Sequence, residues 1–278
     1  MKKAVLVGIN KYQDLPLNGC INDELLFYKI TLEKMGFDIA KMLTDKQATT
    51  KNILNALKIL VKDSKPGDIL LFHYSGHGSQ VPAFDWTTSR EADGMDEIIC
   101  PIDLDWEHPI RDQDMGNIFK NVIKGVNITI ILDACHSGTG LRNPTSGVVS
   151  RYLPPPPEKL LMNPKFTIDD ELRLIAPEYN VNDRQTQKRK FVVTTDLQGD
   201  AILLSGCKDH QTSADALING RYHGAFTYYL VYTLARANYD ITYIDLITRT
   251  GEALKANGYD QVPQVEGLEI NLNKKFLR

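Results

Sequence analysis

The chain carries the side chains for a nucleophilic pair made of a cysteine and a histidine. Its six histidines are His73, His77, His108, His136, His210 and His223, and its four cysteines are Cys20, Cys100, Cys135 and Cys207. A thiol becomes a good nucleophile when a neighbouring imidazole favours its thiolate, and the same imidazole can then protonate a leaving amine. Only Cys135 and His77 both sit in glycine-flanked turns directly after apolar runs. Their position selects them as the candidate nucleophile and base.

The three other cysteines are expected to pack in the core, because a free cysteine usually behaves as a small buried hydrophobic residue. The same interpretation stays open for Cys135 taken alone, and His77 taken alone could be an ordinary turn residue. The joint placement of the two favours chemistry over both of these interpretations.

Two other histidines lie close to the candidate pair in the sequence. His136 adjoins Cys135, but successive residues point in different directions, which makes His136 a poor base. His73 lies inside an apolar run and is expected to be a core histidine with satisfied hydrogen bonds. His73 and His77 together could be ligands in a metal hydrolase, although they straddle a strand and a turn and no third ligand is apparent in the sequence.

The elements that must position the candidate pair are two buried strands. Residues 69–74 and 127–132 are apolar runs of strand length, and each ends in a turn that carries one candidate. In open parallel sheets, ligands bind outside the carboxyl ends of the strands. We therefore expect both turns to open onto one crevice.

Strand-length runs alternate with segments of helical periodicity, which is typical of an α/β fold with a mostly parallel sheet. Expected strands cover residues 4–9, 37–43, 69–74, 127–132, 201–206 and 265–272. Expected helices cover residues 23–35, 50–61, 225–237 and 243–256, with Thr50 as the cap of the second. Residues 141–200, which lie between the expected strands at 127–132 and 201–206, hold seven of the 13 prolines. This composition indicates a long, mobile connection.

Composition excludes several classes of protein. The 278 residues are 42% hydrophobic and 24% charged, as expected of a globular domain. With 32 basic and 35 acidic residues the net charge is −3, which disfavours binding to nucleic acid or to an anionic membrane. The amino-terminal residues predict a strand rather than a signal peptide, and the cysteines form no C-x-x-C pair, so we expect a reducing, cytoplasmic location.

Several motifs, in their order along the chain, resemble the metacaspase branch of the caspase-like cysteine peptidases. The four most specific are Ser75-Gly76-His77-Gly78, Asp93-Gly94-Met95-Asp96-Glu97, Asp133-Ala134-Cys135-His136-Ser137-Gly138 and Leu204-Ser205-Gly206-Cys207-Lys208-Asp209. Further matches lie at residues 18–23, 211–215, 224–228 and 261–264, so the resemblance covers nearly everything except residues 141–200. The chain resembles the compact prokaryotic members, often called orthocaspases.

This resemblance implies a caspase-hemoglobinase fold, in which a central, mostly parallel sheet of about six strands lies between helices. It implies a single caspase-like domain over residues 1–278, with a large part at 1–140, a connection at 141–200 and a small part at 201–278. His77 would be the base and acid, and Cys135 the nucleophile. The backbone N–H groups of Gly78 and Cys135 would stabilise the oxyanion. Such acyl transfer requires no cofactor.

The resemblance also implies an S1 pocket lined by Cys20, Asp23, Ser75 and Asp133 that selects Arg or Lys at P1. Independently, Asp133 lies two residues before Cys135 and therefore shares its strand face. Two carboxylates in a partly desolvated pocket would attract a cation and repel an acidic P1 side chain. Other roles stay open, because Asp23 could stabilise a helix N-terminus and Asp133 could be a structural hydrogen-bond acceptor.

A carboxylate-rich stretch between residues 93 and 114 could bind calcium or could simply be solvated surface. Asp96 and Asp112 match the calcium ligands of metacaspases. Gln113 and Arg142 stand where the family pattern has two further aspartates, and the second replacement is a cation. We therefore predict that calcium binding is weak or dispensable.

The leading hypothesis is an endopeptidase that acts on proteins or peptides after Arg or Lys. The connection at 141–200 contains several basic residues, so it could be a solvated linker or a site of self-cleavage that matures the enzyme. The alternative function is a catalytically silent, caspase-like binding scaffold. We expect a monomer, with no nucleic-acid or membrane partner.

Overall fold

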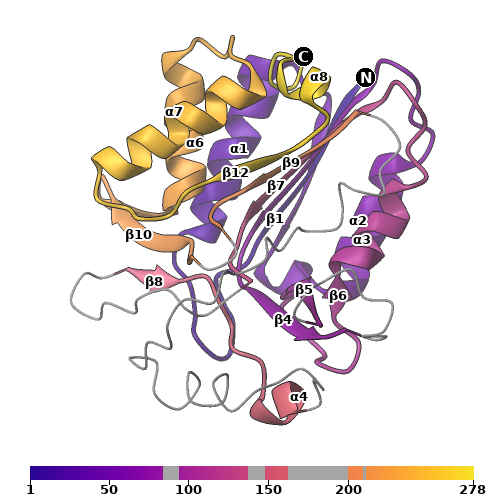
Figure 1. Cartoon of the computed structure of the whole chain (residues 1–278). Coiled ribbons are helices and arrows are strands. Elements are labelled where there is room, and N and C mark those ends of the chain that lie inside the picture. The colour runs from indigo at the N-terminus through magenta and orange to yellow at the C-terminus, as the bar shows by residue number, and fades with distance from the viewer. Residues whose placement is uncertain (84–93, 137–147, 162–199, 209–210) are drawn as a thin grey trace.

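A six-stranded sheet forms the centre of the chain (Figure 1). The computed structural model describes residues 1–83, 94–136, 148–161, 200–208 and 211–278. The strands, in spatial order, are β12 (Gln264–Gly267), β9 (Asp200–Ser205), β7 (Asn127–Asp133), β3 (Ile69–Ser75), β1 (Lys2–Gly8) and β2 (Ile39–Thr44). All neighbours pair in parallel except β12 and β9, which are antiparallel. The expected α/β fold with a mostly parallel, six-stranded sheet is confirmed.

The alternation of side chains along each strand builds a separate core on each face of the sheet. In β1, Val5 and Val7 belong to one buried cluster, whereas Ala4 and Leu6 belong to the other. The strands are largely apolar because both faces are covered, as is usual for parallel sheets.

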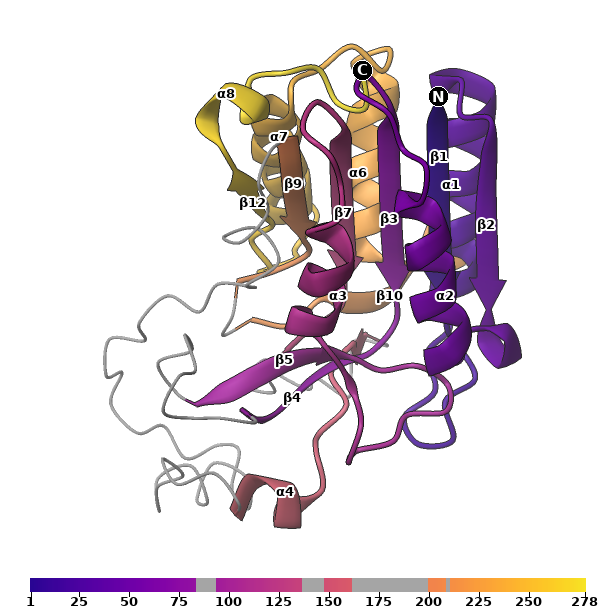
Figure 2. The same ribbon diagram turned by 90° about the vertical axis from the view of Figure 1, so that its right-hand side faces the viewer.

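Helices cover both faces (Figures 1 and 2). On one face lie α1 (Cys20–Met35), α6 (Ala225–Arg236) and α7 (Tyr243–Ala256), and on the other lie α2 (Thr50–Val61) and α3 (Asp112–Phe119). The expectation that Thr50 caps α2 is wrong: the Thr49 side chain accepts the hydrogen bond from Asn52 N at 3.2 Å. Thr49 has extended backbone angles, whereas Thr50 is already helical.

Two small antiparallel sheets lie beyond the carboxyl ends of the central strands (Figure 1). One contains β4 (Gly78–Pro82), β5 (Met95–Ile99) and β6 (Ile110–Arg111). The other contains β8 (Val149–Ser150), β10 (Ala214–Ile218) and β11 (Arg221–Gly224). The sequence did not predict these sheets, whose short strands frame the end of the main sheet where the candidate turns lie.

The last expected strand is only half right. Residues 264–267 form β12, but the following residues form the short helix α8 (Glu269–Leu272) instead of continuing to residue 272. Two other short helices are η1 (Asp45–Gln47) and α4 (Pro157–Leu161). Most of the connection at 141–200 lies outside the described residues.

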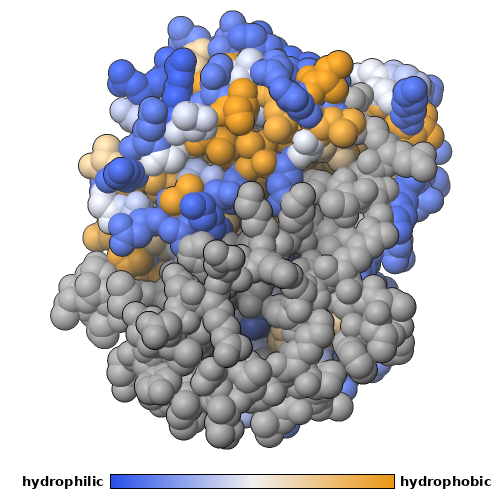
Figure 3. Space-filling model, viewed as in Figure 1, coloured by the Kyte–Doolittle hydropathy of each residue, from blue (hydrophilic) through white to orange (hydrophobic). Residues whose placement is uncertain are grey.

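The surface around β12 is comparatively apolar. In Figure 3, hydrophobic residues gather on the upper part of the molecule, where Figure 1 shows β12 and α8. Leu268, which precedes α8, and Ile270, which lies within it, are 59% and 74% exposed. Among the helices of the described ranges, none combines the length and apolarity needed to cross a membrane.

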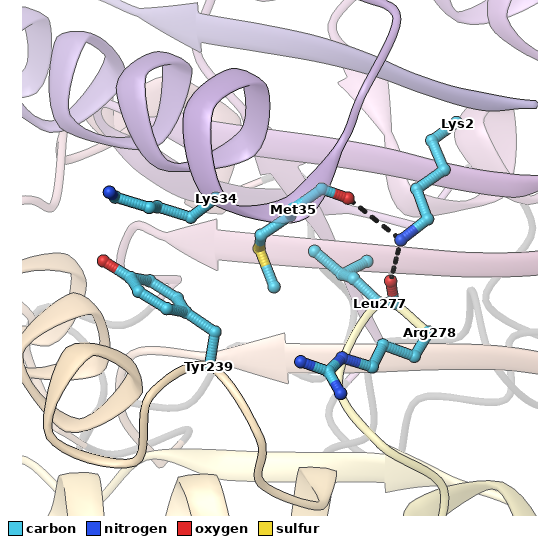
Figure 4. Close-up of a pocket in the computed structure, with 6 residues that line it drawn as sticks. All are labelled: Lys2, Lys34, Met35, Tyr239, Leu277 and Arg278. Atoms are coloured by element: carbon cyan, nitrogen blue, oxygen red, sulfur yellow. Dashed lines mark hydrogen bonds between the residues drawn. The ribbon is translucent and has the colours of Figure 1, made fainter.

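A small pocket lies at the amino ends of the central strands (Figure 4). It is lined by Lys2, Lys34, Met35, Tyr239, Leu277 and Arg278. Lys2 Nζ donates hydrogen bonds to the carbonyl oxygens of Met35 at 3.0 Å and Leu277 at 2.9 Å. Burial, with a smaller effect of Arg278, lowers the pKa of Lys2. The pocket ties the C-terminus to the first strand and lies at the opposite end of the sheet from His77 and Cys135.

Candidate active site

The register of the central sheet brings the two candidate turns together. Ser75 and Asp133, the last residues of β3 and β7, lie opposite one another in neighbouring parallel strands. His77 and Cys135 each follow two residues later, and both are buried. Both turns therefore reach the same end of the sheet.

A buried hydrogen-bond network fixes the position of His77. Its Nε2 lies 2.6 Å from the carbonyl oxygen of Leu15, so Nε2 carries the proton and donates it. The backbone N–H of His77 donates to the Tyr12 hydroxyl at 3.0 Å, and the Tyr74 hydroxyl donates to the His77 carbonyl at 2.7 Å. The other ring nitrogen, Nδ1, is buried and has no hydrogen-bond partner among the described residues. It is therefore available to accept a proton.

Burial lowers the pKa of His77 to about 4, and the backbone groups of Leu15 and Arg151 only partly oppose this effect. The imidazole is accordingly neutral near pH 7. A neutral imidazole with a free Nδ1 has the protonation state that a general base requires.

Close backbone packing places Cys135 beside the turn that follows His77. A Cβ atom on Gly78 would lie 2.3 Å from the carbonyl oxygen of Cys135, so only glycine permits this approach. The Cys135 sulfur accepts a hydrogen bond from Ser213 N. Contact with Cys135, together with burial, raises the pKa of the neighbouring Cys207 thiol well above its ordinary value. Cys207 is therefore a protonated neighbour and not a competing thiolate.

Arg151 occupies the space between the two turns. Its carbonyl oxygen accepts hydrogen bonds from Gly78 N at 3.0 Å and from Cys135 N at 3.2 Å. These are the two N–H groups that the family resemblance implies for an oxyanion site. Their convergence on one carbonyl oxygen makes them able to bind an oxyanion formed at that position.

The Arg151 side chain fills an acidic pocket. Its guanidinium nitrogens lie 2.8 Å from Asp23, 3.0 Å from Asp215 and 3.2 Å from Asp133, and all four side chains are completely buried. The guanidinium also donates to Ser75 Oγ at 2.7 Å. The structure thus brings the expected pocket residues Asp23, Ser75 and Asp133 together around one cation.

The pocket carboxylates raise the pKa of Arg151 well above its ordinary value, despite the opposing effect of burial. Burial raises the pKa of Asp23, but Arg151 and His223 together hold it below its usual value. For Asp215 burial dominates, and its pKa is raised. The Cys20 thiol is also expected in the pocket. Burial raises its pKa well above the ordinary value, and the nearby Arg151 guanidinium opposes this only in part.

Asp215 is the pocket residue that sequence reasoning missed. It belongs to the Gln211–Asp215 motif, but nothing in the sequence indicates that its carboxylate points toward the same cation as Asp23. Strand β10 positions it, and the backbone N–H groups of Asn18 and Gly19 donate to it at 2.7 and 2.9 Å.

Comparison with known proteins shows the family of the chain. A family model described as "Metacaspase, peptidase C14 domain" matches residues 2–144, which is about half of the chain and includes His77 and Cys135. The chain belongs to the metacaspase family. It is 33% identical to Metacaspase-1 of Kluyveromyces lactis, over 99% of this chain and 68% of that protein. It is 34% identical to Metacaspase-1A of Aspergillus terreus, over 98% of this chain and 72% of that protein.

A solved structure supports the fold of this metacaspase. The crystal structure of a Geobacter sulfurreducens protein aligns with a TM-score of 0.69 and 25% sequence identity. The alignment covers 99% of this chain and 98% of the other.

A buried polar chain lies behind the acidic pocket of the metacaspase. His73 Nδ1 bonds to Glu24 at 2.7 Å and its Nε2 bonds to Thr227 at 3.2 Å, while the Thr227 hydroxyl donates to Asp133 at 2.7 Å. Burial raises the pKa of Glu24 to about 6, against the opposing effect of His73. His73 is thus the expected core histidine with satisfied hydrogen bonds, and both of its nitrogens are engaged by protein groups rather than free for a metal.

The residues that match metacaspase calcium ligands are engaged by protein groups. Arg111 donates to one oxygen of Asp96, and Gln113 Nε2 donates to the other at 2.9 Å. Asp112 accepts the backbone N–H of Gln113 at 2.8 Å. Within the described ranges, no cluster of three or more acidic, His or Cys residues could hold a metal ion. Arg142, the other departure from the family pattern, and Asp93 lie outside these ranges. The described arrangement does not fit a calcium site.

Proposed function

We propose that this metacaspase is a cysteine endopeptidase that hydrolyses peptide bonds after Arg or Lys, with Cys135 as nucleophile and His77 as base and acid. The observation that carries this proposal is the double placement of Arg151. Its carbonyl oxygen accepts the N–H groups of Gly78 and Cys135, and its guanidinium lies among three buried carboxylates. A substrate with a basic P1 residue would bind in the same way.

The proposed reaction uses the free nitrogen of His77. Nδ1 accepts the thiol proton, and the Cys135 sulfur attacks the P1 carbonyl carbon. The two N–H groups stabilise the oxyanion, a contribution of about 3 kcal/mol for each donor in comparable sites. His77 then protonates the leaving amine, and water hydrolyses the thioester. None of these steps requires a cofactor.

The pocket supports selectivity for a cation. Asp23, Asp133 and Asp215 are buried without solvent access, so an acidic P1 side chain would add a fourth carboxylate to the group. An uncompensated buried charge costs about 3 to 5 kcal/mol, which is a large penalty against Asp at P1. Arginine should be preferred over lysine, because its planar guanidinium reaches several carboxylates at once.

The remaining features of the proposal concern regulation and context. Because Arg111 and Gln113 donate hydrogen bonds to the two carboxylate oxygens of Asp96, we propose that calcium is weakly bound or dispensable. Self-processing within residues 141–200 is part of the proposal, as is a monomer that acts on proteins. The four cysteines are free and buried, which fits a reducing compartment such as the cytoplasm.

A pair of fluorogenic peptides tests the proposed function. One peptide ends in Arg and the other in Asp before the reporter, and each is offered to the wild type, Cys135→Ala and Cys100→Ala. The last variant controls for loss of a buried cysteine outside the site. We expect release from the Arg peptide by the wild type and Cys100→Ala only. No thiol-dependent release from either peptide would instead favour a silent binding scaffold, and release only after Asp would contradict the pocket argument.

A further inference from the structure

The backbone that leads to Arg151 is bound as an added strand. Strand β8 pairs antiparallel with β10, with Ser150 opposite Ala214. The Arg151 N–H donates to the Ser213 carbonyl at 3.1 Å. Adding an extended segment to the edge of a sheet is a common way to bind a peptide. The residues before Arg151 thus lie where the unprimed side of a substrate would lie.

The backbone that follows Arg151 is held on the other side of the site. Tyr152 forms a parallel bridge with Gly78, and Leu153 N donates to the Gly78 carbonyl at 3.0 Å. The prolines at 154–156 keep the chain extended until helix α4 begins at Pro157. Both sides of the Arg151–Tyr152 bond are therefore fixed across the candidate active site.

A purely structural ion pair does not explain this arrangement. An ion pair among carboxylates explains why the Arg151 side chain is buried. It does not explain why the Arg151 carbonyl oxygen accepts hydrogen bonds from the N–H groups of Gly78 and Cys135. Lys159, the other basic residue described between 148 and 161, provides a contrast. It pairs with Glu107, which is 70% exposed, at the surface. Only Arg151 meets the demands of both the pocket and the oxyanion site in this part of the chain.

We infer that Arg151–Tyr152 is the peptide bond that this metacaspase cleaves in itself, and that residues 148–153 block the substrate groove until that bond is cut. The inference rests on the proposed function, and it names the internal substrate and the regulation of the same site.

The reaction consumes one water molecule. The Cys135 sulfur bonds to the Arg151 carbonyl carbon as the bond to the Tyr152 nitrogen breaks, and the thiol proton passes through His77 to that nitrogen. Water then adds to the thioester carbon, its oxygen remains on Arg151 as part of a carboxylate, and the sulfur leaves. The products are residues 1–151 and a chain that begins with the free amine of Tyr152.

Cleavage loosens the block. The new carboxylate on Arg151 adds a negative charge next to the acidic pocket, and the anchor through Leu153 no longer holds the segment. Strand β8, the contacts of the Arg151 main chain and the Arg151 side chain then retain it without that anchor. The intact chain should consequently hydrolyse added peptides slowly at first, with a lag that ends as the Arg151–Tyr152 bond is cut. Because the segment is already bound within its own chain, the rate of the cut should not depend on protein concentration.

Intact-mass analysis and amino-terminal sequencing test the bond. The chains compared are the wild type, Cys135→Ala, Arg151→Gln, Arg151→Lys and the matched control Lys159→Gln. We expect residues 1–151 and 152–278 from the wild type, Arg151→Lys and Lys159→Gln, at a rate unchanged by tenfold dilution. Cys135→Ala and Arg151→Gln should remain uncut at this bond. Arg151→Lys keeps a cation in the pocket and should be cut at the same bond but more slowly than Lys159→Gln, so the ratio of these two rates decides the question if Arg151→Gln fails to fold.

Hydrolysis of the Arg peptide distinguishes a wrong bond assignment from a wrong proposed function. The bond assignment is overturned if the wild type hydrolyses this peptide but its new amino terminus is not Tyr152, or if folded Arg151→Gln is cut like the wild type; the proposed function then still stands. If the wild type neither hydrolyses the peptide nor cuts itself, the proposed function fails. Folded Arg151→Gln should hydrolyse the peptide without a lag, and a lag equal to that of the wild type would contradict the block.

Discussion

The Asp23 carboxylate lies 2.8 Å from the Arg151 guanidinium, although 128 residues separate them in the sequence and both side chains are completely buried. Asp23 belongs to the first turn of α1, whereas Arg151 directly follows β8. A buried cation of this kind is stable only where several carboxylates surround it. The pair shows that the end of the central sheet is built to hold one basic side chain beside Cys135.

Asp215→Asn tests the pocket carboxylate that the sequence did not reveal. Removing one of the buried carboxylates that surround a bound guanidinium typically costs about 2 to 5 kcal/mol of binding free energy. We therefore expect kcat/KM for the Arg peptide to fall about 100-fold. The loss should appear mainly in the preference for Arg over an uncharged P1 residue. Asp105→Asn, which alters an exposed carboxylate, is the control. An unchanged preference in Asp215→Asn would remove Asp215 from the specificity pocket.

Gly224→Ala tests the space that the P1 side chain needs. A Cβ atom at this position would lie 2.1 Å from Asp133 Oδ2 and 2.5 Å from Arg151 Nη1, so the methyl group would displace the guanidinium. Steady-state kinetics with the Arg peptide should show at least about a 100-fold lower kcat/KM, as is typical when a reacting group is misplaced by about 1 Å. The matched control is Gly116→Ala in α3, where an added Cβ would meet no atom within 4 Å. Equal activity of the two variants would show that Gly224 does not bound the pocket.

The burial of His77 predicts a specific pH dependence of stability. Its pKa is lowered from 6.5 in the unfolded chain to about 4 in the folded one. The unfolded state therefore binds more protons between these values, and the free energy of unfolding should decrease by about 3 kcal/mol as the pH is lowered through this window. His77→Gln should lack this part of the pH dependence. Urea denaturation at about pH 7 and about pH 4 gives the free energy of unfolding of the wild type and of His77→Gln. If this free energy changed equally with pH in both chains, the imidazole would be in solvent, contrary to the prediction.

Calcium should have little effect on activity. Arg111 and Gln113 already bond to the oxygens of Asp96, so a divalent cation would have to displace a guanidinium from its carboxylate. Assays of the Arg peptide with a calcium chelator, and with added calcium chloride, should give kcat/KM values within about twofold of each other. A large loss with chelator that calcium restores and magnesium does not would contradict this prediction.

Much of the fold could be predicted from the sequence because its strands are apolar on both faces. Strands β1, β3 and β7 consist mainly of hydrophobic residues, and the turns that carry His77 and Cys135 follow directly from where β3 and β7 end. Periodicity also indicated α2, but it could not choose between Thr49 and Thr50 as the cap, since either hydroxyl could accept the bond. It could not separate β12 from α8 either, because residues 265–272 alternate ambiguously between polar and apolar types.

The contents of the pocket could not be predicted in this way. Strand β8 is only two residues long, and its partner β10 lies more than 60 residues away, so no local pattern indicates their pairing. In a proline-rich connection with several basic residues, Arg151 looks like any solvated cation. Its burial depends on the carboxylates of Asp23, Asp133 and Asp215, which only the tertiary fold assembles.

The most direct test of the central claim is covalent labelling of the nucleophile. Matched peptidyl chloromethyl ketones that end in Arg or Asp are incubated with the wild type, Asp23→Asn and His77→Gln, and the adduct is located by peptide mass mapping. The proposal predicts that the Arg reagent modifies Cys135 in the wild type, that labelling slows in both variants, and that the Asp reagent leaves Cys135 unmodified. Labelling of a different cysteine, or equal labelling of Cys135 by both reagents, would contradict the account.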